Sequence, residues 1–229
     1  MRDIVGLDVG QSVDPTAVCV LEVVTRKDEL DKMIAGKPSA VDMSWYPKNR
    51  DGGIKDPHGI YRVDVRHLER LPLQMPYPEQ IEHVKRILGR PPLESPKTDL
   101  VLDRTGVGAA VSDLFVREGL DPVMVTITAG DGESRGSTYR DWRVSKLSLV
   151  SRLQAMLHGG QLKIAEGLDE AQALVWELQD FRATASDHGN WRFGARSGRH
   201  DDLVLALAIG AWWAAHDYGK IRSGWTTFD

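Results

Sequence analysis

Acidic residues at three widely separated places in the chain have the types and settings of a metal-binding site. Asp8 and Asp103 each end an apolar run, and the pair Asp201 and Asp202 begins a third. Carboxylates at two strand ends and one helix start can converge at one edge of a sheet. Because gathered carboxylates repel one another, they need cations between them, and oxygen-only ligands suit Mg²⁺ or Mn²⁺.

These acidic positions predict phosphodiester chemistry. Two divalent ions ~3.5–4 Å apart are a common device for displacement at a phosphodiester. We therefore expect metal-dependent cleavage of nucleic acid with two Mg²⁺ or Mn²⁺ ions. The candidate catalytic and metal-binding residues are Asp8, Asp103, Asp201 and Asp202, with Asp14 as a weaker metal ligand.

Each acid also has a purely structural interpretation. Asp8 or Asp103 could simply end a strand, although an acid between apolar neighbours in a central strand is costly unless it is used. Asp201 or Asp202 could be the helix N-cap, a position that favours Asp. The sequence leaves open which of the two caps and which binds metal. We favour Asp202 pointing inward with Asp201 also near the ions, and Asp14, which precedes a proline, could only shape a turn.

Other site chemistries have less support in the sequence. His200 could cap the helix, contact a phosphate or help to deliver a proton. No grouping of Cys and His has zinc spacing, and no Gly-x-Ser-x-Gly elbow of a serine hydrolase is present. The single cysteine, Cys19, lies in an apolar run, so we expect a buried structural thiol and no disulfide.

The first part of the chain has the pattern of an antiparallel meander. Runs at residues 4–9 and 16–24 indicate strands, and the turn-forming residues between them favour a hairpin. A third strand is expected at 60–65. It follows a polar stretch at 25–57 that we interpret as a surface insertion.

Helices and strands alternate in the rest of the chain. Helices are expected at 78–88, 107–118, 144–157, 169–181 and 201–215, and strands at 100–103, 123–127, 162–164 and, at a sheet edge, 191–193. The glycine-rich stretch 128–139 is expected to be a loop. These patterns predict one α/β domain over 1–229, with a mixed sheet (an antiparallel three-strand meander plus parallel strands) flanked by helices. The first strand would lie centrally, beside the strand that ends at Asp103.

Composition sets broad limits on the protein class. The chain has 229 residues, of which 41% are hydrophobic, and a formal net charge of -4. It is long enough to bury a core. The negative charge argues against indiscriminate binding of nucleic acid, but it allows a local basic patch. No signal peptide or apolar stretch of transmembrane length occurs, so we expect a cytoplasmic protein with no membrane partner.

Two basic clusters interrupt the overall negative charge. The first surrounds the glycine-rich stretch and consists of Arg135, Arg140, Arg143, Lys146 and Arg152; the second, just before the acidic pair, consists of Arg192, Arg196 and Arg199. Basic side chains neutralise phosphates without reading the base sequence. We expect contacts with DNA from Arg143, Lys146, Arg196, Arg199 and His200. The alternative is an ordinary solvated surface.

Five short motifs follow one another across the chain in an informative order. They are GLDVG at 6–10, DPTA at 14–17, LDRTGVG at 102–108, KLSLV at 146–150 and HDDLVLAL at 200–207. In type and order they resemble the motifs of the nuclease domain of phage large terminases. The resemblance implies an RNase H-like fold. It also implies an endonuclease that cuts concatemeric double-stranded viral DNA during genome packaging, using two divalent metals.

The chain departs from that family in one respect. A full large terminase also has an N-terminal ATPase motor, but no Gly-x-x-x-x-Gly-Lys-Ser/Thr phosphate loop occurs here. We therefore expect an isolated nuclease domain or a stand-alone relative. The resemblance implies that it would act in the host cytoplasm, with an ATPase motor domain, a small terminase subunit and a portal as partners.

Three other functions are compatible with part of this pattern. A Holliday-junction-type resolvase shares the same acidic residues. A non-catalytic RNase H-like module for DNA binding or packaging shares the fold, although retention of all the acids argues against it. An ATPase of the actin and sugar-kinase type also places Asp-x-Gly after its first strand, but the sequence at 103–106 matches its second loop poorly.

Overall fold

The computed structural model describes residues 2–25, 61–105, 108–130, 132–180, 182–185, 191–194 and 201–223. Most of the expected insertion at 25–57 lies outside these residues. So does the basic segment that holds Arg196, Arg199 and His200. Within the described ranges, no helix combines the length and apolar character needed to cross a membrane.

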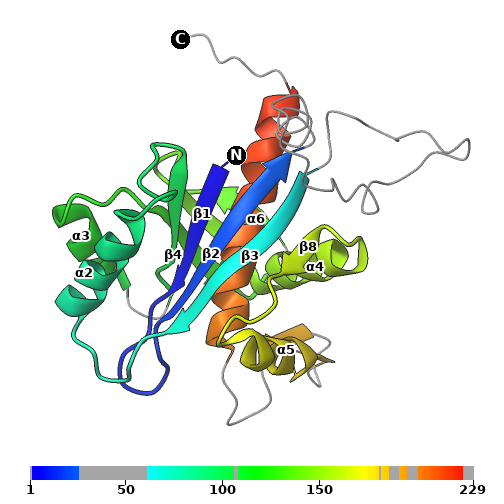
Figure 1. The fold of residues 1–229 in the computed structure, drawn as a ribbon. Helices are drawn as coiled ribbons and strands as arrows, with labels where there is room; N and C mark the ends of the chain where they lie inside the picture. The colour runs from blue at the N-terminus through cyan, green and yellow to red at the C-terminus, as the bar shows by residue number, and fades with distance from the viewer. Residues whose placement is uncertain are drawn as a thin grey trace, which may run out of the picture.

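A mixed sheet of eight strands forms the centre of the molecule (Figure 1). The strands are β1 (Arg2–Asp8), β2 (Ala17–Thr25), β3 (Tyr61–Arg70), β4 (Thr98–Asp103), β5 (Val123–Thr128), β6 (Glu133–Arg135), β7 (Asp141–Ser145) and β8 (Leu162–Ile164). Their order in the sheet is β6-β7-β5-β4-β1-β2-β3-β8. β1, β2 and β3 form an antiparallel meander, whereas β4 runs parallel to β1 and β5 parallel to β4. The predicted mixed sheet and the central place of the first strand are confirmed.

Helices cover both faces of the sheet. They are α2 (Tyr77–Leu88), α3 (Gly108–Arg117), α4 (Lys146–His158), α5 (Ala171–Asp180) and α6 (Asp202–Ser223). Residues of α4 and α6 share one core cluster, and residues of α2 and α3 share the other. Figure 1 shows α6 running along the sheet behind β1 and β2, with α2 and α3 side by side beyond β4.

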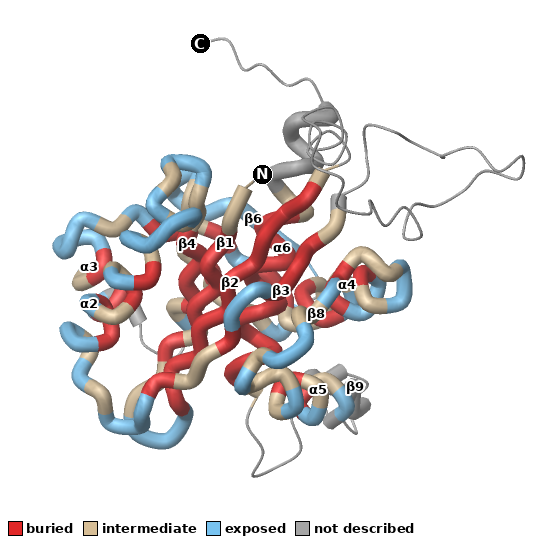
Figure 2. The backbone as a smooth tube through the Cα atoms, in the orientation of Figure 1, coloured by how far each residue is buried: buried red, intermediate tan, exposed pale blue. Residues whose placement is uncertain are grey.

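Alternation along β1 divides the buried interior between these two clusters. Ile4 packs in the α6 cluster, whereas Val5 and Leu7 pack in the cluster of α2 and α3. Gly6 therefore faces α6, and a Cβ there would collide with the carbonyl oxygen of Ala206 in that helix. Glycine allows α6 to lie directly on the strand, and this contact is part of the buried centre that Figure 2 shows in red.

The start of the fourth helix differs from the prediction because a short strand precedes it. The expected loop at 128–139 contains β6, which pairs with β7. Val144, assigned to a helix from sequence, belongs to β7, where it is buried with Trp142 on alternate positions. The helix begins only at Lys146, because the Ser145 hydroxyl accepts a hydrogen bond from the Ser148 backbone N–H at 3.0 Å and caps it.

Larger differences from the prediction occur in the third strand, at residues 191–193 and in the last helix. The third strand continues to Arg70 rather than ending at 65. Residues 191–193 belong to β10 (Trp191–Gly194), which pairs with β9 (Arg182–Ala185) in a separate two-stranded sheet rather than at the edge of the main one. The last helix extends to Ser223. The prediction that Cys19 is a buried thiol is confirmed.

Candidate metal centre

The first pair of carboxylates is brought together by the register of two parallel strands. Asp8 is the last residue of β1 and Asp103 the last of β4, and the two are partners in the ladder between these strands. Asp8 follows Ile4 and Gly6 on the face that α6 covers. Asp103 lies on the same face, because it is two residues after Val101, which packs in the α6 cluster.

The second pair of carboxylates lies at the start of α6. The Asp201 carbonyl oxygen accepts a hydrogen bond from the Leu205 backbone N–H at 2.9 Å, and Asp202 is the first helical residue. A side chain from another helix caps this end: Glu177 of α5 accepts from the Val204 backbone N–H at 2.9 Å. Glu177 therefore satisfies one of the free backbone N–H groups at this end of α6.

All four predicted acids line one cavity of about 450 Å³. Residues from the end of β1 and the turn after it, the start of α2, the end of β4 and the start of α6 form its walls: Asp8, Val9, Gly10, Gln11, Ser12, Val13, Asp14, Pro15, Tyr77, Asp103, Thr105, Asp201, Asp202 and Leu205. Asp14, the weaker candidate, is exposed in the turn but also lines this cavity. The structure thus brings together residues from three distant parts of the sequence.

Burial and mutual repulsion act on the two strand-end carboxylates. Burial raises the pKa of Asp8 well above its usual range, and the negative charges of Asp103, Asp202 and Asp201 raise it further, against a smaller opposing effect of Lys146. Burial also raises the pKa of Asp103. Hydrogen bonds to Asp103 Oδ1 from the Thr105 backbone N–H at 2.8 Å and hydroxyl at 2.6 Å oppose that rise. Positive charge close to these carboxylates would therefore stabilise their ionised forms.

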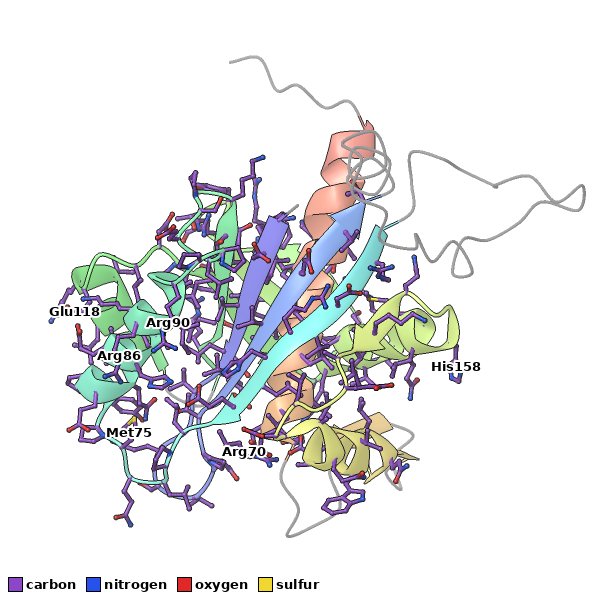
Figure 3. All side chains as sticks on the ribbon, viewed as in Figure 1. Arg70, Met75, Arg86, Arg90, Glu118 and His158 are labelled. Carbon is purple, nitrogen blue, oxygen red and sulfur yellow. The ribbon has the colours of Figure 1, made fainter. Side chains whose placement is uncertain are left out.

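Two basic side chains supply part of this positive charge. Lys146, the first residue of α4, donates from Nζ to Asp201 Oδ2 at 2.8 Å. Arg70, the last residue of β3, donates from Nε to Asp202 Oδ2 at 2.6 Å. Figure 3 shows Arg70 at the end of β3 beside the start of α6. One oxygen of each helix-start carboxylate is thus bound to a cation of the protein itself.

The donor set fits a hard divalent cation. Within the described residues, no three Asp, Glu, His or Cys side chains stand close enough together to hold a metal ion as they are placed. The four aspartates nevertheless line a single cavity, they supply only oxygen atoms, and their repulsion would be relieved by a cation between them. Asp8 and Asp103 would hold such an ion at the strand ends, with Asp201 and Asp202 completing its surroundings from the helix.

The basic residues predicted to bind DNA have different positions relative to this cavity. Lys146 contacts Asp201 beside the cavity, although it is not one of the residues that line it. Arg143 is exposed on β7 between Trp142 and Val144, which pack in the α6 cluster, so its side chain lies on the opposite face of the sheet from the carboxylates. Arg140, which belongs to the first basic cluster, donates a hydrogen bond from its guanidinium to the Asp121 carbonyl oxygen at 2.5 Å. Arg196, Arg199 and His200 lie outside the described residues.

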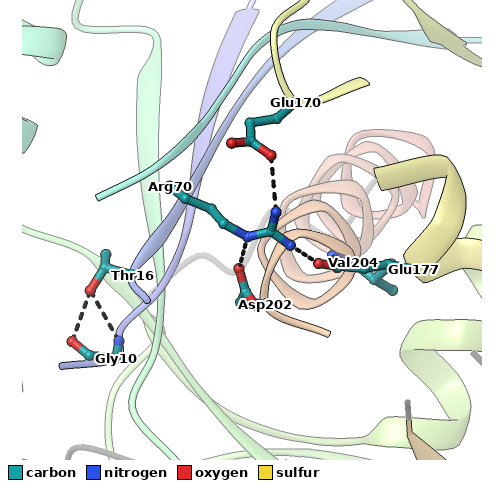
Figure 4. Close-up of polar contacts among 7 residues, drawn as sticks. All are labelled: Gly10, Thr16, Arg70, Glu170, Glu177, Asp202 and Val204. Carbon is teal, nitrogen blue, oxygen red and sulfur yellow. Dashed lines mark hydrogen bonds and ion pairs between the residues drawn. The ribbon is translucent and has the colours of Figure 1, made fainter. Parts of the chain in front are cut away.

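Sequence reasoning missed four polar residues around the acids. Thr105 orients Asp103. Arg70 contacts Asp202, and Glu170 and Glu177 contact Arg70, as Figure 4 shows. Arg70 was missed because the predicted third strand ended before it. Thr105 had a visible signal, since a threonine two residues after a strand-end aspartate can donate from both its N–H and its hydroxyl.

Comparison with known proteins shows the fold. No protein-family model and no curated protein matches the chain. Among solved structures, the large terminase nuclease from thermophilic phage G20c with bound magnesium is 18% identical, covers 92% of this chain and 80% of its own, and has a TM-score of 0.57. The Thermus phage P74-26 large terminase nuclease domain is 17% identical over 91% of this chain and 77% of its own, with a TM-score of 0.54. The likeness shows that the chain shares the fold of these nuclease domains, as the five motifs predicted.

Proposed function

We propose that this protein is a divalent-metal-dependent endonuclease that cuts double-stranded DNA. The observation that carries the proposal is the convergence of Asp8, Asp103, Asp201 and Asp202 on one cavity from two strand ends and a helix start. Structural or solvated roles would not require four carboxylates to share one cavity at the cost of raising the pKa of two of them.

Each residue of the centre has a defined part in this proposal. A pair of bound Mg²⁺ or Mn²⁺ ions would supply an activated water and neutralise charge on the phosphate. Asp8 and Asp103 would hold the ions from the sheet, and Asp201 and Asp202 would hold them from α6. Thr105 fixes the orientation of the Asp103 carboxylate through two hydrogen bonds. Lys146 holds Asp201 and brings a positive charge to the entrance for DNA. Asp14, which also lines the cavity, would be an outer ligand.

We further propose that the biological substrate is concatemeric viral DNA, cut during genome packaging in the host cytoplasm. Support comes from the likeness of the fold to large terminase nuclease domains over 92% of this chain. An ATPase motor domain, a small terminase subunit and a portal are the partners that such a role requires. Arg196, Arg199 and His200 are the proposed DNA contacts beyond the cavity, whereas Arg143, on the opposite face of the sheet from the carboxylates, is not among them.

A plasmid-cleavage assay tests the proposed activity. Supercoiled DNA should be nicked and linearised with Mg²⁺ or Mn²⁺, much less with Ca²⁺, whose longer and looser coordination positions the attacking water poorly, and not in excess EDTA. Asp8→Asn and Asp103→Asn should each abolish cleavage. Asp113→Asn, at an exposed position of α3, is the matched control and should cleave as the wild type does.

Two outcomes of this assay would contradict the proposal. Full cleavage in excess EDTA would exclude the metal mechanism. Normal cleavage by either active-site variant would place that residue outside the reaction. A parallel arm with a four-way junction separates the alternatives, because a resolvase would cut the junction and leave the plasmid intact, and a non-catalytic module would cut neither.

A further inference from the structure

The Arg70 guanidinium is shared among three carboxylates beside the candidate metal centre. Its Nε contacts Asp202 at 2.6 Å, one terminal nitrogen contacts Glu170 at 2.9 Å, and the other contacts Glu177 (Figure 4). Asp202 and Glu177 are almost fully buried, with side-chain exposures of 3% and 7%. Buried carboxylates need a partner of opposite charge, and Arg70 supplies it to both.

Arg70 belongs to the same row of the sheet as the strand-end acids. The ladder places Asp103 opposite Asp8, Asp8 opposite Ala17, and Ala17 opposite Arg70. Residues in one row project from the same face of neighbouring strands. Ala17 separates the acids from the arginine. Because its side chain is small, space remains above it for the long Arg70 side chain to reach the start of α6.

A β-bulge in β3 turns Arg70 toward that face. The register places Val65 opposite Leu21 but His67 opposite Val20, so Arg66 is an extra residue in the strand. Val63 and Val65 pack in the α6 cluster before the bulge, and Leu68 packs there after it. Without the extra residue, Arg70 would project from the other face. Bulges that redirect a side chain are common beside active sites.

The bulge itself is held by charged contacts. Arg66 donates to Glu22 at 2.7 Å and to Asp64 at 3.0 Å. Both acids are buried and lie on the neighbouring and the same strand. These contacts favour the bulged register over a regular strand, and they lie away from the candidate metal centre. Arg66, Glu22 and Asp64 thus stabilise the bulge that directs the Arg70 side chain toward α6.

From this geometry we propose that Arg70 is a positioning residue, which orients the Asp202 carboxylate for metal binding. This proposal rests on the proposed function. Glu170 and Glu177 anchor the guanidinium, and neither lines the cavity. Glu177 also caps α6 through the Val204 N–H. One planar group therefore fixes the end of β3, α5 and the first turn of α6 relative to one another.

A positioning role and a competing role predict opposite effects on metal binding. If Arg70 merely occupied Asp202 in place of a metal, its removal would tighten metal binding. If it orients Asp202, its removal weakens binding, because partners of metal ligands commonly contribute 10–100-fold to affinity. Lysine keeps the charge but lacks the planar fork that reaches three carboxylates at once, so Arg70→Lys should restore only part of the loss.

The test is calorimetric titration of Mn²⁺ into the wild type and its variants without DNA. We expect Arg70→Gln to weaken Mn²⁺ binding by about 10–100-fold and Arg70→Lys to weaken it less. In an Asp202→Asn background, Arg70→Gln should cause no further loss, because the effect acts through Asp202. Arg117→Gln, on the exposed last turn of α3, is the matched control and should bind as the wild type does.

The same titrations contain the outcomes that would overturn the proposal. Unchanged or tighter binding by Arg70→Gln contradicts it, as does an equal further loss in the Asp202→Asn background. If Arg70→Gln does not fold, as judged by thermal unfolding, Arg70→Lys and Glu170→Gln provide the same comparison with smaller changes. A wild type that binds no Mn²⁺ would contradict the proposed function as well, whereas normal wild-type binding and cleavage with unaffected Arg70 variants would contradict this inference alone.

Discussion

At the level of the single residue, burial and neighbouring negative charges have the same effect on the Asp8 carboxyl group. Both raise the pKa of its carboxyl group, the neighbouring charges coming from Asp103, Asp202 and Asp201. An ionised Asp8 is therefore unfavourable in the folded protein without a cation. The residues that would bind a metal are the residues that destabilise the metal-free fold, as expected for a site adapted to function rather than to stability.

This conflict predicts a pH-dependent gain in stability for Asp8→Asn in metal-free buffer. Because the folded-state pKa of Asp8 lies above its ordinary value of 3.8, the ionised form destabilises the wild type at neutral pH. The melting temperature of Asp8→Asn should exceed that of the wild type at pH 7. The difference should shrink as the pH falls through the raised pKa toward 3.8, where the wild-type carboxyl is already protonated.

Thermal unfolding in EDTA over a series of pH values measures this difference. Asp113→Asn, on the exposed surface of α3, serves as the control and should follow the wild type at every pH. A difference between Asp8→Asn and wild type that does not change with pH would show that the charge of Asp8 has no part in it.

The acids could be found from sequence, but Arg70, the partner of Asp202, could not. Asp8 and Asp103 were visible because an acid at the end of an apolar run is unusual, and Asp201 and Asp202 because they begin an apolar helix. Arg70 gave no such signal. The direction of its side chain depends on the bulge at Arg66. Such a bulge shifts the alternation of inward and outward side chains by one residue, so the alternation alone cannot reveal it.

At the level of elements, the distance between β1 and α6 decides whether the two pairs of carboxylates can meet. Gly6 lies two residues before Asp8, and Ala206 lies in the first turns of α6, shortly after Asp202. A side chain at Gly6 would collide with the Ala206 carbonyl oxygen. The close contact between strand and helix therefore depends on the absence of a single Cβ.

Gly6→Ala should consequently affect both stability and activity. Relief of the collision requires α6 to move away from β1, and such overpacking costs about 1–3 kcal/mol. The same movement separates Asp202 from Asp8, so we expect a large loss of metal-dependent cleavage in the fraction that remains folded. Chemical denaturation and the plasmid assay measure the two effects.

Gly130→Ala is the matched control for this substitution. A Cβ at Gly130 has nothing within 4 Å and no positive backbone φ to oppose it. This variant should unfold and cleave as the wild type does. Wild-type stability and cleavage by Gly6→Ala would show that α6 does not need to lie so close to the strand.

The helices and strands that could be placed from the sequence were those whose sequence signals lie within or next to the element itself. The β1–β2 hairpin followed from apolar runs and turn residues, which act within one segment, and the central place of β1 followed from the order of strands and helices along the chain. The start of α4 did not follow, because Val144 fits the apolar pattern of the helix and the strand β7 equally well. The Ser145 cap decides between them, and a capping contact is a property of the folded chain.

At the scale of the whole molecule, the sheet gathers a site from residues that are nearly 200 positions apart in the chain. β1 and β4 are parallel and end in the same row, so their last residues meet. α6 crosses the same face of the sheet, and its first turn meets that row. Separate changes at the end of β1, the end of β4 or the start of α6 should therefore all disable the same activity.

A crystal of the protein soaked with Mn²⁺ tests the central claim most directly. We expect anomalous peaks for two ions in the cavity, with oxygen atoms of Asp8 and Asp103 at about 2.1 Å from a metal and a carboxylate of Asp201 or Asp202 completing the set. The same soak of Asp8→Asn should lose at least one ion. A well-ordered cavity without metal, or Mn²⁺ bound only elsewhere on the surface, would contradict the account.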